Sequence, residues 1–156
     1  MVLKPKIVAK MKQMYIDFEA FDKMFADAKG YHKRAKLFVA EGQRPSLIFN
    51  VSSVALECYL IALCELNGEM PRNHTYISMM NTVEQHMTVP RELSKSIRSL
   101  DIIFGICPID NYHHGVPEPA DAARVLSLCD MVLELFDPKQ ITSVRLAAEI
   151  DEFSLN

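Results

Sequence analysis

The polar residues that could do chemistry gather at a few places in this 156-residue chain. His74 stands between Asn73 and Thr75, just ahead of an expected helix, where Asn or Thr can cap exposed backbone N–H groups. A second group lies in a loop rich in proline and glycine, and it comprises Asp110, Asn111, Tyr112, His113 and His114. Loops often carry functional residues, and histidine titrates near neutral pH. Each group also has a structural interpretation: a helix cap for the first, and incidental exposed histidines for the second.

Glu57 is the third candidate, because it interrupts the most apolar segment of the sequence, residues 46–66. At helical spacing it continues a narrow polar stripe formed by Ser46, Asn50 and Ser53. A helix that is apolar on almost every side must be enclosed by its neighbours, so 46–66 is the expected centre of a bundle. A buried carboxylate without a partner is costly, so we expect Glu57 to form a salt bridge or a cap rather than to catalyse.

Common catalytic and metal-binding patterns are missing from the sequence. It contains no HExxH, no ExxH, no glycine-rich phosphate loop and no GxSxG, which counts against common hydrolases. The four cysteines, Cys58, Cys64, Cys107 and Cys129, form no CxxC pair. We therefore predict no metal and no cofactor.

The ends and the apolar segments favour a cytoplasmic protein. The first fifteen residues have no apolar core typical of a signal peptide. The longest purely apolar run in 46–66 extends from Cys58 to Cys64, far short of the roughly 18 residues that indicate a membrane span. We expect reduced thiols and no membrane contact.

Charge is unevenly distributed along the chain. Residues 1–44 carry ten Lys/Arg against five Asp/Glu, whereas residues 45–156 carry seven against fifteen. The basic run Lys29, Lys33, Arg34 and Lys36 could contact phosphate groups, and Tyr112 could stack on a base. The same asymmetry could equally keep a helix face solvated or let two parts of one molecule attract each other.

Hydrophobic periodicity predicts an all-α, up-and-down bundle of about five helices in a single domain, 1–156. The first helix is expected from near Pro5, and Gly30 should either kink it or separate it from a piece at 31–41. Further helices are expected at 46–66, at about 75–87, from Pro90 onward and at about 120–136. The tail from Lys139 could form a short helix at about 144–150.

One apolar seam on the first helix has two interpretations. Its residues recur in alternating steps of four and three: Ile7, Met11, Met14, Phe18, Phe21, Phe25 and Ala28. Phe18, Phe21 and Phe25 could form the core of the bundle, or they could bury the same area against a second copy of the chain.

Three runs of the sequence resemble the HEPN domain family. They are VALECYLIALCELNGEMPRNHTYISMM, VPRELSKSIRSLDIIF and PADAARVLSLCDMVLEL, and together they place a HEPN-like core at 31–136. Residues 1–30 would then be an N-terminal helix and 138–156 a C-terminal tail. Glu57 matches the glutamate of the family's central helix, His74 the histidine at a helix start, and Leu100-Asp101 a later Leu-Asp pair.

The resemblance implies a helical bundle that pairs as a homodimer. Family members include metal-independent ribonucleases, toxins of toxin–antitoxin pairs, and noncatalytic proteins that bind nucleotides, RNA or a partner nucleotidyltransferase. The nuclease branch uses an arginine followed four to six residues later by a histidine, and no arginine of this chain has that spacing.

We therefore expect a noncatalytic, HEPN-like dimeric binding module that acts with a protein or a nucleotide or nucleic-acid partner. Its ligand-binding candidates are Tyr112, His74, Lys33 and Arg34. The alternative is a divergent metal-independent ribonuclease, in which folding of the loop would bring Arg98 to His113 or His114.

Overall fold

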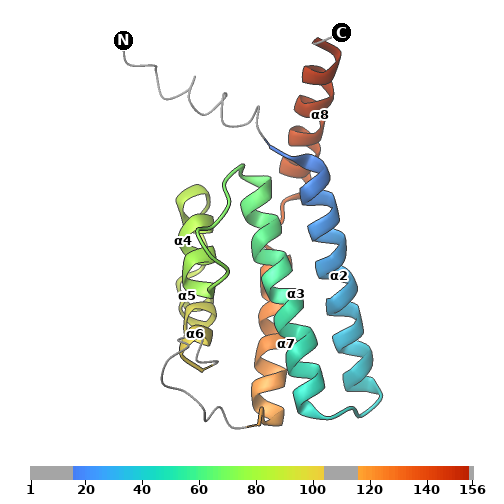
Figure 1. The fold of residues 1–156 in the computed structure, drawn as a ribbon, viewed down its shortest axis with the longest axis vertical. Helices are drawn as coiled ribbons and strands as arrows, with labels where there is room; N and C mark the ends of the chain where they lie inside the picture. Colours follow the sequence, from blue (N-terminus) through green and yellow to red (C-terminus); the bar gives the residue numbers. More distant parts are fainter. Residues whose placement is uncertain (1–15, 104–115, 155–156) are drawn as a thin grey trace.

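The computed structural model describes residues 16–103 and 116–154, and within these ranges every regular element is an α-helix (Figure 1). The long helices are α2 (Phe18–Ala40), α3 (Pro45–Leu66), α7 (Pro119–Leu133) and α8 (Pro138–Ser154). Three shorter ones follow α3 in the chain: α4 (Tyr76–His86), α5 (Arg91–Arg98) and α6 (Leu100–Ile103). The helices pack against one another as a bundle, so the predicted all-α class is confirmed.

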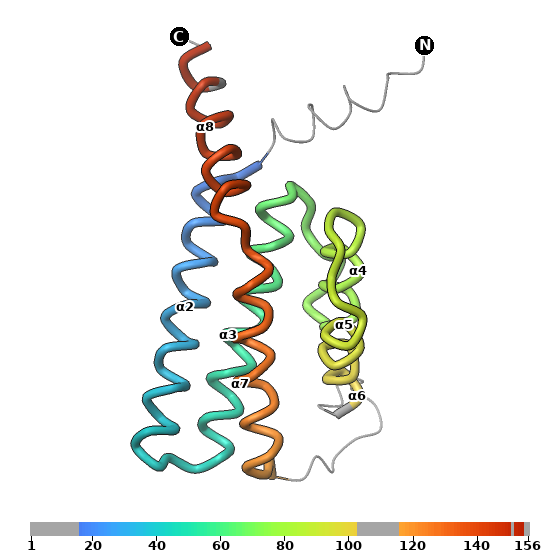
Figure 2. The backbone as a smooth tube through the Cα atoms, turned by 180° about the vertical axis from the view of Figure 1, so that it is seen from behind, coloured from blue at the N-terminus to red at the C-terminus, as the bar shows by residue number. Residues whose placement is uncertain are grey.

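Helix α3 is the centre of the bundle, as its composition predicts. It lies against α2 and α7 along its length, and the short helices α4 to α6 stand on its other side (Figures 1 and 2). Twelve of its 22 residues are buried. Helix α3 is long and apolar enough to cross a membrane, but 61% of its most apolar 18-residue stretch is buried inside the bundle. Burial in a core explains its composition without a membrane.

Aromatic side chains fill the space between α2, α3 and the end of α7. Phe21 is fully buried, and its ring stacks on that of Phe25 at a centroid distance of 5.5 Å. Phe25 in turn stacks on Phe136 at 4.4 Å and meets the edge of Tyr59 at 6.2 Å. Phe18 packs beside Phe21, and the guanidinium of Arg145 from α8 lies over the ring of Phe18. The Phe18–Phe21–Phe25 seam therefore contributes to the core of a single chain.

Helix α8 leaves the bundle at the end where α2 begins (Figures 1 and 2). Its first turns are held by buried Val144 and by Arg145, which donates two hydrogen bonds of 3.0 Å to the carboxylate of Asp22. Its later turns project past α2 (Figure 1). Leu146, Ile150 and Phe153 on this helix are more than half exposed.

Three expectations about the helices need correction. Gly30 neither kinks nor divides the first helix, because α2 continues through it; the position is exposed, and a single glycine costs a helix only about 1 kcal/mol. The helix predicted after Pro90 is divided at Ser99 into α5 and α6. The tail helix is 17 residues long rather than a short piece at 144–150.

The first helix, predicted to begin near Pro5, does not run unbroken into α2. Helix α2 begins at Phe18, and the side chain of its N-cap residue Asp17 accepts a hydrogen bond from the amide of Ala20 at 2.9 Å. Ile7, Met11 and Met14 lie outside the described residues, as do Phe104 and Cys107, the last residues of the stripe expected on the helix after Pro90.

Candidate functional site

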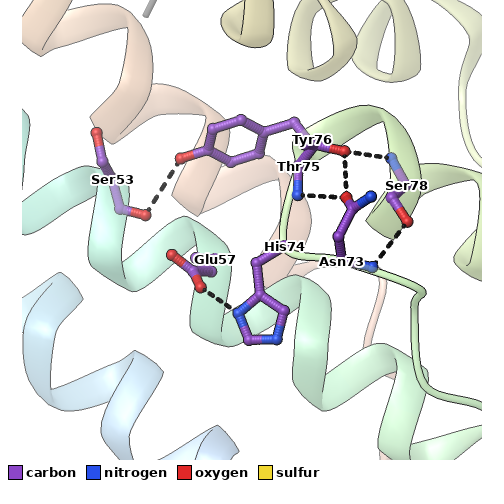
Figure 3. Close-up of polar contacts among 7 residues, drawn as sticks. All are labelled: Ser53, Glu57, Asn73, His74, Thr75, Tyr76 and Ser78. Atoms are coloured by element: carbon purple, nitrogen blue, oxygen red, sulfur yellow. Dashed lines mark hydrogen bonds and ion pairs between the residues drawn. The ribbon is translucent and has the colours of Figure 1, made fainter. Parts of the chain in front are cut away.

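Glu57 and His74 meet at the start of α4, as Figure 3 shows. Oε1 of Glu57 on α3 lies 2.8 Å from Nδ1 of His74, which precedes α4 in the chain. The expectation that Glu57 has a partner is therefore confirmed. Both side chains remain partly exposed, 39% for Glu57 and 59% for His74. Water can reach the pair, and solvent-exposed pairs contribute only about 0–1 kcal/mol to stability.

The residues around His74 form a cap for α4. Thr75 is the N-cap, and its hydroxyl oxygen accepts a hydrogen bond from the amide of Ser78 at 3.1 Å. The side-chain oxygen of Asn73 accepts hydrogen bonds from both the amide and the hydroxyl of Thr75, at 3.0 and 2.7 Å (Figure 3). The geometry of Asn73-His74-Thr75 thus agrees with its structural interpretation, which is a helix cap.

Asp101 completes the same helix end from a distant part of the chain. Its two carboxylate oxygens accept hydrogen bonds from the amides of Tyr76 and Ile77, at 2.9 and 2.8 Å. These amides belong to the first turn of α4, where backbone N–H groups lack partners within the helix and the helix dipole favours negative charge. The structure therefore brings together three positions on which the family resemblance rests, Glu57, His74 and Asp101. Together they hold the start of α4 in place.

Arg98 is occupied by neighbours on α4 and α5. Its Nε donates to the hydroxyl of Ser94 at 3.1 Å, and its two terminal nitrogens donate to Asn81 and Glu84 at 2.7 and 3.0 Å. Bonds from Ser94 and Arg98 to the Glu84 carboxylate lower the pKa of Glu84. Arg98 therefore joins α5 to α4, and all three of its nitrogens already have acceptors.

An open groove of about 900 Å³ lies beside this joint, between α4 and the pair α5 and α6. The cations Arg91, Lys95 and Arg98 line it, together with apolar side chains that include Ile77 and Ile102. The groove thus combines apolar walls with several positive charges.

The basic run on α2 lies on the opposite side of α3 from this groove (Figure 1). Lys29 lies over the ring of Phe25, and Lys36 forms an ion pair of 2.8 Å with Asp130 of α7. Lys33 and Arg34 are exposed on the same helix, so they remain candidate contacts for an anionic ligand. They share no site with His74.

The described cysteines are not activated nucleophiles. Burial raises the pKa of the Cys58 thiol to about 11, and the nearby carboxylate of Glu57 adds to the shift. Burial also raises the pKa values of the Cys64 and Cys129 thiols to about 12. All three stay protonated at neutral pH, whereas cysteine chemistry requires the thiolate.

His32 is a buried polar residue that the sequence analysis missed. Its Nδ1 lies 2.9 Å from the hydroxyl oxygen of Tyr59. Its Nε2 lies 2.9 Å from Oδ1 of Asp130, close enough for electrostatic attraction but not aligned as a hydrogen bond. Burial, reinforced by Lys36, lowers the pKa of His32 despite the opposing effect of Asp130. His32 therefore links α2, α3 and α7 as a neutral imidazole at neutral pH.

A simple extension of the apolar seam would have identified His32. The steps of four and three that align Phe18, Phe21, Phe25 and Ala28 continue to His32 and then to buried Ala35. The position of His32 in the apolar seam indicates that it is buried, although its neighbours in the sequence include lysines.

Tyr112, His113 and His114 lie outside the described residues, so their position relative to Arg98 stays a prediction. Among the residues that the structure does describe, no three His, Cys, Asp or Glu side chains form a group that could hold a metal ion.

Comparison of the chain with family models, with curated proteins and with solved structures finds no match. The HEPN resemblance therefore rests on the quoted motifs, and any function has to be argued from the residues of this chain.

Proposed function

We propose that this protein is a noncatalytic, HEPN-like binding module that pairs as a homodimer and acts with a protein, nucleotide or RNA partner in the cytoplasm. A nucleotidyltransferase and the antitoxin of a toxin–antitoxin pair are partners of the kind that the resemblance implies.

The observation that carries the proposal is the apolar stripe on α8, which we define as Leu146, Ile150 and Phe153. Steps of four and three residues place these side chains on one face of the helix. Their exposed fractions are 54%, 64% and 85%. Apolar residues at this spacing are the usual seam between two packed helices, so the stripe suits contact with a second chain.

The polar candidates support binding rather than catalysis. Glu57, His74 and Asp101 serve the end of α4, and Arg98 is bonded to three neighbours. In the ribonuclease alternative, Arg98 would have to release Glu84 and Asn81 before it could stabilise the charge on a phosphate. A His113→Ala, His114→Ala double variant tests that alternative directly: RNA cleavage that falls with the double substitution would favour an enzyme.

Light scattering on the purified protein tests the dimer. We expect the wild-type chain to have twice the monomer mass and the Ile150→Glu variant to be a folded monomer, because a carboxylate in the middle of the stripe would be buried without a partner. Leu37→Glu is the matched control, because Leu37 is 51% exposed on α2, away from the stripe, and should not change the mass. A wild-type monomer, or an unaltered dimer in Ile150→Glu, would contradict this use of α8.

A further inference from the structure

Helix α8 presents an apolar face that its own bundle does not cover. Val144 is buried against the bundle, and Leu146 follows two positions later, which at 3.6 residues per turn is nearly the opposite face of the helix. The apolar stripe on α8 therefore faces away from the contacts that hold this helix. Arg145 fixes the start of α8 to α2 through two hydrogen bonds, and these bonds help to set the direction in which the stripe faces.

Negative charge accompanies the stripe along one flank of α8. Glu149 and Glu152 each precede a stripe residue by one position, so they lie on the same flank, and both are exposed. Arg145 lies on that flank as well, but its charge is already paired with the carboxylate of Asp22. A surface that matches α8 therefore needs apolar side chains with positive charges along one edge.

The groove between α4 and the pair α5 and α6 has positive charges of this kind. Arg91, Lys95 and Arg98 follow one another on α5 in steps of four and three residues, so they share one face of the helix, and we call them the cation row. Glu84 lines the same groove and pairs with Arg98 at 3.0 Å, whereas Arg91 and Lys95 are exposed. Three cations against one carboxylate leave two net positive charges among the residues that line the groove.

The groove also has the apolar walls that the stripe needs. Ile77 on α4 and Ile102 on α6 are 42% and 79% exposed, and Met87 and Val89 line the groove from the segment that connects α4 to α5. The dimensions of the two surfaces agree as well. The stripe on α8 and the cation row on α5 both repeat in steps of four and three residues, so each extends about 10 Å along its helix.

Within one chain, the two surfaces lie on different sides of α3. Helix α8 rises on the α2 side of α3, whereas α4 to α6 stand on the other side (Figures 1 and 2). A twofold axis perpendicular to α3, placed at the end of the bundle where α8 leaves, brings α8 of each chain beside α4 to α6 of the other. Each chain then gives one helix and receives one, so the interface is closed and self-complementary.

We infer that α8 of one copy docks in the α4–α6 groove of a second copy, and that this exchange is reciprocal. The stripe packs against the apolar walls, and the carboxylates of Glu149 and Glu152 lie along the cation row. Burial of the stripe supplies most of the affinity, while the charges set the register and the choice of partner. The inference rests on the proposed homodimer and identifies the surface that receives the stripe.

Charge reversal tests the exchange, with the mass of the full-length protein measured by light scattering over a range of concentrations. The Arg91→Glu, Lys95→Glu variant reverses the groove, and the Glu149→Lys, Glu152→Lys variant reverses α8. We expect the dissociation constant of the dimer to rise at least about tenfold in each, because attraction becomes repulsion at both contacts of the dimer. Variants that both dimerise as tightly as the wild type would overturn the exchange.

Mixing the two charge-reversed variants gives the sharpest result. In a mixed pair, the reversed helix of one chain meets the reversed groove of the other, and the two unaltered surfaces meet at the second contact. We therefore expect the mixture to dimerise nearly as tightly as the wild type. A mixture that stays monomeric, although circular dichroism and a thermal melt show both variants to be folded, would overturn the exchange. Lys95→Glu mixed with Glu149→Lys is a milder pair with the same expected outcome.

The matched control is Lys33→Glu, Arg34→Glu, which makes the same change of charge as the groove variant but on the opposite side of α3. We expect it to dimerise like the wild type. An equal rise in its dissociation constant would mean that the dimer responds to overall charge, and that result would overturn the groove. Ile102→Glu tests the apolar wall separately, and we expect it to weaken the dimer as Ile150→Glu does.

The homodimer and the exchange can fail separately. If Ile150→Glu dissociates the dimer but neither Ile102→Glu nor the Arg91→Glu, Lys95→Glu variant does, the stripe binds another surface, such as the stripe of the second copy. That outcome would overturn the groove and leave the homodimer in place. A wild-type protein that is monomeric at every concentration would remove both.

Discussion

The two sides of α3 differ in how much polar contacts add to apolar packing. On one side, α2 and α7 are 23 and 15 residues long, and aromatic rings and fully buried aliphatic side chains join them to α3. On the other side, α4, α5 and α6 have only eleven, eight and four residues. Buried Met79, Met80 and Ile97 pack them into the same core, and polar contacts at their ends add to this packing.

This difference explains why the polar residues gather where they do. Helices shorter than about 12 residues are marginal on their own and have few turns with which to bury an apolar face. Caps and ion pairs at their ends therefore supplement the apolar packing that fixes their positions. Asp101 binds two amides of α4, Arg98 joins α5 to α4, and His86 at the end of α4 pairs with Glu69 beyond α3. In this region, residues that resemble a catalytic site in type hold the structure together.

We expect the largest loss of stability from a substitution on the apolar side of α3. Phe21→Ala removes a fully buried ring that touches Phe18, Phe25 and Phe136, and we expect it to lower the free energy of unfolding by about 3–5 kcal/mol. Urea denaturation followed by circular dichroism measures the change. Leu37→Ala, on the exposed face of the same helix, should stay within about 0.5 kcal/mol. A loss below about 1 kcal/mol for Phe21→Ala would show that the seam is not a core.

A smaller effect is expected on the polar side. Asp101→Ala leaves the amides of Tyr76 and Ile77 without their acceptor, and we expect a loss of about 1–2 kcal/mol. Hydrogen exchange should show faster exchange at these two amides while the amides of α2 keep their protection. Asp101→Asn retains one acceptor oxygen and should fall between the two. Uniformly faster exchange across α2 and α4 would instead mean that the two sides unfold together.

The pH dependence of stability provides a further test, at His32 on the α2 side of α3. Because burial lowers the pKa of His32, the unfolded chain binds a proton at higher pH than the folded one. The contribution of His32 is thus fully present above its ordinary pKa of 6.5 and is lost as the pH falls through the lowered value. We expect His32→Gln to have a flatter stability profile than the wild type from pH 6.5 downward. Parallel profiles would contradict this prediction.

The smallest effect is expected at the Glu57–His74 pair. Both side chains are well exposed, so a double-mutant cycle with Glu57→Gln and His74→Gln should give a coupling energy below about 1 kcal/mol. Thermal unfolding of the four proteins measures it. A coupling above about 2 kcal/mol would mean that this pair is as important to its side of α3 as the aromatic rings are to the other.

The sequence predicts the apolar side far better than the polar side. The composition of 46–66 and the seam through Phe18, Phe21 and Phe25 show helices and burial directly, because periodicity is a local property. The need for a partner at Glu57 was also predictable. Its identity was not, since His74 lies seventeen residues away and its approach depends on the turn after α3.

Caps that come from other helices are still harder to predict. Asp101 and Tyr76 are 25 residues apart, and only the packing of α6 against α4 brings them together. The division at Ser99, which places Asp101 on its own short helix, has no strong signal such as proline or glycine in the sequence. The same holds for Arg98, whose partners Asn81 and Glu84 lie on a different helix.

The connection between α2 and α3 has a consequence for the order of folding. Residues 41–44 link the two longest helices, and Gly42 takes a φ of 68° there, so the chain reverses direction within four residues. The two helices can therefore find each other through a short loop, which costs little entropy to close and favours fast folding. A much longer stretch of chain separates α7 from α3, so we expect α7 to pack later. We expect the α2–α3 hairpin to form first, as the template onto which α7 and the short helices then assemble.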